Sequence, residues 1–77
     1  MNAERLAEMV NDIANFFAAE PDRNLAIDGV TNHLRKFWEP RMRRQILAYL
    51  DEKSGEGLSD IVLAALRSYR KELTPVG

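Results

Sequence analysis

The sequence predicts a small all-α fold, a bundle of four helices. Apolar residues recur at steps of three and four positions in four separate segments, which is the spacing of one face of a helix. Prolines or a glycine-rich turn separate these segments, and no stretch shows the alternating pattern of a strand. The 77 residues are expected to form a single domain, residues 1–77, with a disordered tail from about residue 74 to residue 77.

The first helix is expected from about Ala3 to Ala19, with Asn2 as its cap and Pro21 as the residue that ends it. Its apolar face comprises Leu6, Met9, Val10, Ile13, Phe16 and Phe17. The second helix is expected from Asp22 to Trp38, and Gly29 inside it either admits a close neighbour or is a tolerated weak point. Its apolar side comprises Leu25 or Ala26, Val30, Leu34, Phe37 and Trp38, with Ile27 at the edge.

The third helix is expected from Pro40 to about Lys53, because proline suits the first helical position. Its apolar side comprises Met42, Ile46, Leu47, Tyr49 and Leu50. Turn residues 54–57 end it, and Ser59 is a candidate cap for a fourth helix from Asp60 to about Leu73. The stripe of that helix comprises Ile61, Val62, Ala65, Leu66, Tyr69 and Leu73.

The segment from Phe37 to Pro40 leaves almost no linker, so a sharp corner is expected at Trp38–Pro40. Phe16 and Phe17 are adjacent, as are Phe37 and Trp38, and neighbours on a helix diverge by about 100°. One aromatic residue of each pair is therefore expected at the rim of the core.

The composition argues against catalysis by this chain. Without cysteine, and with His33 as the one histidine, the chain offers no zinc, iron–sulfur or thiol chemistry. Serines 54, 59 and 68 fit a turn, a cap and a solvated helix position, and no phosphate-binding loop is present. We therefore expect neither a catalytic, cofactor or metal site nor enzyme activity. The absence of a long apolar run or a signal-like amino terminus predicts a cytoplasmic protein without a membrane span.

Positive charge is concentrated in one segment. Residues 33–44 contain five cations and one acid, a charge of +4, whereas the whole chain carries −1. The cations are Arg35, Lys36, Arg41, Arg43 and Arg44. A core of this size contributes only about 3–5 kcal/mol of net stability, and with no disulfide to add to it a partner is the remaining source. Self-association stays open for the same reason.

Three interpretations of this basic corner, residues 35–44, are open. In the first, the arginines pair with the chain's own acids and Trp38 belongs to the core. In the second, the arginines bind an anion or nucleic acid and Trp38 stacks on a base, although nearly balanced charge makes this a weak electrostatic footprint. In the third, the corner is a protein interface, since tryptophan and arginine are enriched at binding hot spots. Its contact residues are then Arg35, Phe37, Trp38, Glu39, Arg41, Met42, Arg43 and Arg44.

Residues 35–43, which read RKFWEPRMR, resemble a segment of the delta subunit of soluble NAD-dependent formate dehydrogenases that contain molybdenum or tungsten. The lead-in Asn32-His33-Leu34 and residues 6–17, LAEMVNDIANFF, are also similar to that family. The resemblance covers roughly residues 5–50. After Asp51 only the general character agrees, a turn followed by a helix rich in leucine and alanine.

The resemblance implies a non-catalytic accessory subunit that supports assembly or stability of a complex oxidising formate to carbon dioxide with NAD⁺. The molybdopterin cofactor, iron–sulfur clusters and flavin would belong to the larger subunits, of which the catalytic alpha subunit is the expected partner. Docking would insert Trp38 or Phe37 and pair Arg41, Arg43 and Arg44 with carboxylates of that partner. The alternative is a small helical module that binds an anion or nucleic acid through residues 35–44.

Overall fold

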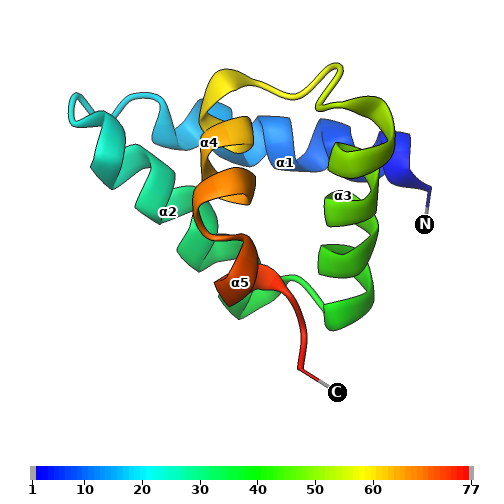
Figure 1. The fold of residues 1–77 in the computed structure, drawn as a ribbon. Helices are drawn as coiled ribbons and strands as arrows, with labels where there is room; N and C mark the ends of the chain where they lie inside the picture. The colour runs from blue at the N-terminus through cyan, green and yellow to red at the C-terminus, as the bar shows by residue number, and fades with distance from the viewer. Residues whose placement is uncertain (1, 77) are drawn as a thin grey trace.

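The computed structural model describes residues 2–76, so Met1 and Gly77, the last residue of the predicted tail, lie outside the described residues. Within that range the chain forms helices and no strand, which confirms the predicted all-α class. The helices are α1 (Ala3–Phe17), α2 (Arg23–Phe37), α3 (Pro40–Lys53), α4 (Asp60–Ser68) and α5 (Arg70–Leu73) (Figure 1).

The helices begin where the sequence places their capping residues. Asn2 and Ser59 each accept a backbone N–H of the following turn, as predicted, and Asp22 accepts two at the start of α2. These side chains satisfy donors that have no partner inside the helix. Pro40 opens α3, where a missing N–H costs nothing.

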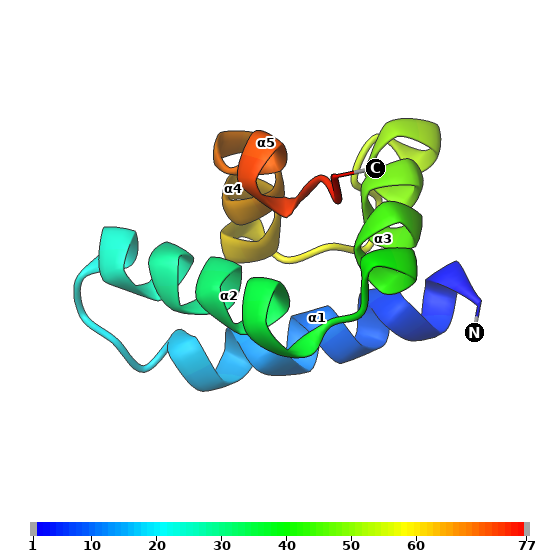
Figure 2. The same ribbon diagram turned by 90° about the horizontal axis from the view of Figure 1, so that it is seen from below.

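The helices pack around α1, which contacts α2, α3 and α4. α1 and α2 run in opposite directions and cross at an angle, α4 lies against α2, and α3 crosses the N-terminal half of α1 (Figures 1 and 2). Only Trp38 and Glu39 separate α2 from α3, and the chain turns sharply there, as predicted. Among residues 2–76, no helix has the length and apolar character needed to cross a membrane.

The core follows the predicted stripes, with adjustments in α1 and α2. α1 buries Leu6, Ala7, Val10 and Ala14, so its buried face is rotated away from Phe16, which is 77% exposed. In α2 the choice between Leu25 and Ala26 falls on Ala26, and Leu25 is 55% exposed. Ile27, expected at the edge, is buried, whereas Phe37, expected on the apolar side, is mostly exposed. The largest fully buried side chains are Leu6, Val10, Val30, Leu34, Ile46, Val62, Leu66 and Leu73.

The predicted fourth helix, Asp60 to Leu73, is interrupted. Tyr69 leaves the helical region, with φ −115° and ψ 25°, and divides the segment into α4 and α5. Its phenol donates a hydrogen bond of 2.6 Å to Asp28 on α2. The break thus occurs at the residue that ties this segment to a distant helix.

The loop between α3 and α4 is held by α1. The Asn11 side chain donates to the Gly57 carbonyl at 2.8 Å and accepts the Ser59 backbone N–H at 2.9 Å. The loop uses left-handed backbone at Ser54, Gly55 and Gly57. Because Ser59 also caps α4, Asn11 fixes the starting point of that helix.

Candidate functional site

The basic corner is built by the end of α2 and the start of α3. Trp38 and Glu39 both have extended backbone. Glu39 precedes Pro40, and a residue before proline disfavours the helical region, so α2 has to end before this position. The Trp38 N–H still donates to the Leu34 carbonyl, at 3.1 Å, so the first link of the corner remains tied to α2.

The two aromatic residues at the corner point to different environments. Trp38 is 5% exposed and belongs to the core, whereas Phe37 is 70% exposed. The Phe37 ring lies 4.9 Å from the His33 ring, between centroids. Together with exposed Phe16, this confirms that one residue of each aromatic pair lies at the rim. Of the two rings expected to insert into a partner, only Phe37 is accessible, and Trp38 is too buried to stack on a base.

Four cations of the corner are exposed: Arg35, Lys36, Arg41 and Arg44. Within residues 2–76, none of them forms an ion pair within 4.0 Å. The ion pairs there join Arg5 to Glu8, Arg23 to Asp60 and Arg70 to Asp51. The first interpretation is therefore wrong about the corner arginines, which form no ion pair with the acids of residues 2–76. Its placement of Trp38 in the core is confirmed.

The other corner residues divide between surface and interior. Glu39 is exposed and makes no capping hydrogen bond. Met42 is half-buried against the core. Arg43 is also half-buried, with one guanidinium nitrogen 3.5 Å from the Leu73 carbonyl and with its buried Nε lacking a hydrogen-bond partner among the described residues. Arg43 is thus turned toward α5, and it is less exposed than Arg41 and Arg44.

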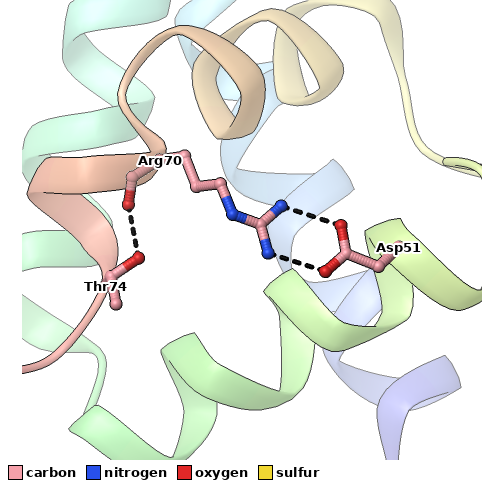
Figure 3. A network of polar contacts seen from close by, with 3 residues as sticks. All are labelled: Asp51, Arg70 and Thr74. Atoms are coloured by element: carbon pink, nitrogen blue, oxygen red, sulfur yellow. Dashed lines mark hydrogen bonds and ion pairs between the residues drawn. The ribbon is translucent and has the colours of Figure 1, made fainter.

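Next to Arg44, a bidentate ion pair joins α3 to α5. The Arg70 guanidinium donates to both carboxylate oxygens of Asp51, at 2.8 and 2.6 Å, while Thr74 donates to the Arg70 carbonyl (Figure 3). These bonds lower the pKa of Asp51 below its ordinary 3.8, against an opposing desolvation effect. An open hollow of about 230 Å³ lies beside the pair, lined by both residues, Arg44 and the segment 74–75. Nineteen positions separate the partners, so no local pattern in the sequence indicates this contact.

A second hollow, of about 290 Å³, lies where the end of α1 meets the outer face of α2. It brings Lys36 and Phe37 of the corner together with residues that the sequence did not assign to any site: Phe17, Gly29, Asn32 and His33. Positions 29, 33 and 37 form a helical stripe, but glycine and histidine in this stripe do not by themselves indicate a hollow. Among the described residues, no three His, Asp or Glu side chains are grouped so that they could hold a metal ion.

A comparison with known families identifies the chain. The family model for the NADH-dependent formate dehydrogenase delta subunit FdsD matches residues 5–66. The match includes α1, α2, the corner and α3, and it extends through most of α4, beyond the part in which the sequence alone showed a specific resemblance. Comparisons with curated proteins and with solved structures gave no match. The chain therefore belongs to the delta-subunit family of NADH-dependent formate dehydrogenases.

Proposed function

We propose that this chain is a non-catalytic accessory subunit that supports assembly or stability of the catalytic subunits of a formate dehydrogenase complex. Membership of the delta-subunit family implies partner subunits. In this proposal the complex is cytoplasmic and converts formate and NAD⁺ to carbon dioxide and NADH. The larger subunits hold the molybdopterin, iron–sulfur and flavin groups, and the catalytic alpha subunit is the docking partner.

The docking proposal rests on the exposure of the cations at the corner. Arg35, Lys36, Arg41 and Arg44 are exposed and unpaired among the described residues, and Phe37 beside them is mostly exposed. Arginine forms planar, bidentate pairs with carboxylates, and pairs that become desolvated at an interface are the ones whose loss is costly. An acidic surface on the partner would complement these cations.

The test is co-purification of the full-length chain with its dehydrogenase subunits after a high-salt wash. An Arg41→Ala/Arg44→Ala variant should be retained at least tenfold less, because truncating one side of a desolvated charge pair costs about 2–5 kcal/mol. Arg43 is left intact because it contacts the Leu73 carbonyl.

The matched control is Lys53→Ala/Arg67→Ala, which removes the same two charges from exposed positions outside the corner. Retention of both variants at the wild-type level would contradict docking through the corner. Recovery of nucleic acid without dehydrogenase subunits, lost steeply with rising salt, would instead support the anion-binding alternative.

A further inference from the structure

The hollow between α1 and α2 is lined by two aromatic rings, those of Phe17 and Phe37, and by Gly29, which has no side chain. Asn32, His33 and Lys36 complete the lining. A Cβ at position 29 would lie 2.4 Å from Cδ1 of Phe17, so the glycine is what allows this ring to lie against the α2 backbone. The shape of the hollow therefore depends on one residue of α2 and one of α1.

Two aromatic pairs extend the apolar surface. Phe16 contacts Phe17 edge-to-face, with ring centroids 5.2 Å apart, and His33 contacts Phe37 at 4.9 Å. Phe16 and Phe37 are 77% and 70% exposed, and Phe17 connects them because it contacts the first and lines the same hollow as the second. Contiguous apolar patches of this kind on a small protein mark interaction sites more often than scattered exposed residues do.

The rim is complementary to a negatively charged partner. Lys36 and His33 are the ionisable residues that line the hollow, and no carboxylate of the described chain does. Lys36 has no ion-pair partner among residues 2–76, and neither does neighbouring Arg35. A partner segment with an apolar side chain and a nearby carboxylate would pack into the hollow and form an ion pair with Lys36 at its rim.

The dimensions favour a protein segment over a small molecule. The volume of the hollow, about 290 Å³, is at the lower limit of the roughly 300–1,000 Å³ that is typical of small-molecule sites. Such sites also enclose most of the surface of their ligand. The walls are helix side chains and offer no strand edge for an extended peptide to pair with. An occupant whose own backbone is already hydrogen-bonded, an amphipathic helix, fits such a groove.

We propose that this hollow is the docking groove for an amphipathic, acidic helix of the larger subunit. An apolar side chain of that helix lies against the rings of Phe17 and Phe37, and a carboxylate pairs with Lys36. This inference rests on the proposed accessory function and names the surface and the kind of segment through which it acts. It also extends the interface from the corner onto α1.

The test compares Phe37→Ser and Lys36→Glu with Leu25→Ser in the full chain, co-purified with the dehydrogenase subunits. Leu25 is the matched control because it is an exposed apolar residue of α2 that does not line the hollow. Circular dichroism and the unfolding midpoint first establish that all three variants keep the wild-type fold. We expect Leu25→Ser to be retained like the wild type, and the two groove variants to be retained at least tenfold less.

A photo-reactive phenylalanine analogue at position 37 then identifies the occupant. Cross-linking to an amphipathic segment of the larger subunit that carries Asp or Glu supports the groove. Cross-linking only to a second copy of this chain overturns it in favour of self-association. If Phe37→Ser and Lys36→Glu are retained like the wild type, the groove is wrong while the accessory function stands. If the wild type itself retains no dehydrogenase subunit, both proposals fall.

Discussion

The ring of Phe17 lies directly on Gly29, with Cδ1 and Cε1 2.4 and 2.5 Å from the place that a Cβ at position 29 would occupy. Glycine inside a helix costs about 1 kcal/mol relative to alanine, so α2 is locally weakened at this position. Because position 29 has no side chain, the end of α1 can approach α2 closely. The sequence left open whether Gly29 admits a neighbour or is a weak point, and the contact with Phe17 decides for the neighbour.

Gly29→Ala should therefore fail to stabilise the protein. The gain in helix propensity is offset by displacement of the Phe17 ring, and overpacking of this kind typically costs about 1–3 kcal/mol. We expect a lower midpoint of urea unfolding with an unchanged slope. In a Phe17→Ala background the space is free, so the same change should become stabilising by about 1 kcal/mol. The same sign in both backgrounds would show that the contact is not what fixes glycine at position 29.

Asn11 should be the polar residue of α1 most sensitive to truncation. Asn11→Ala removes the hydrogen bonds to the Gly57 carbonyl and from the Ser59 N–H, and a typical intramolecular hydrogen bond contributes about 0.5–1.5 kcal/mol. Asn15→Ala is the matched control, because Asn15 lies on the same helix and is exposed. Denaturant unfolding of both variants checks this prediction. Equal effects of the two substitutions would show that the Asn11 hydrogen bonds do not stabilise the loop.

Much of the fold could be predicted because helix periodicity, caps and prolines are local signals. The starts of α1, α3 and α4, the corner and the rim position of one aromatic residue in each pair all follow from neighbours in the sequence. Contacts between distant residues have no such signal. Asn11 is one polar residue on an amphipathic helix, and nothing near it indicates that it holds a loop more than 40 positions away. The break at Tyr69 likewise coincides with a contact to Asp28, 41 positions away.

The candidate site was predictable in its charge but not in its shape. The clustering of cations in residues 35–44 is visible in the sequence, and four of the five are exposed. The orientation of each side chain depends on the direction in which α3 leaves the corner. This direction turns Arg43 toward Leu73 and buries Trp38. The hollow at Gly29 needs α1 and α2 side by side, a relationship that periodicity does not contain.

The hydrogen bond from Tyr69 to Asp28 should make stability fall at alkaline pH. This bond, followed by the negative charge of Asp28, raises the pKa of the Tyr69 phenol above its ordinary 10.0. Because the pKa of this phenol is higher in the folded chain than in the unfolded chain, its contribution to stability is fully present below pH 10.0. That contribution is lost as the pH rises through the pKa of the folded state.

Two variants check this prediction. Tyr69→Phe should show a shallower loss of stability than the wild type above pH 10, because it has no phenol to ionise. In a Tyr49→Phe variant, Tyr69 is the remaining tyrosine, and its tyrosinate absorbance should appear at higher pH in the folded protein than in urea. Coincident titrations in the two states would contradict the raised pKa.

Trp38 and Phe37 should respond to truncation in opposite ways, although they are adjacent at the corner. Trp38→Ala empties a core position, and replacing a buried tryptophan by alanine costs about 3–5 kcal/mol. Because a domain of this size has about 3–5 kcal/mol of stability from its core, this variant should be largely unfolded by circular dichroism. Phe37→Ala removes a ring that is 70% exposed, so its unfolding midpoint should change by less than the equivalent of about 1 kcal/mol. If Phe37→Ala unfolds the chain and Trp38→Ala does not, then Phe37 and not Trp38 belongs to the core. Loss of partner binding by Phe37 variants would in that case reflect misfolding.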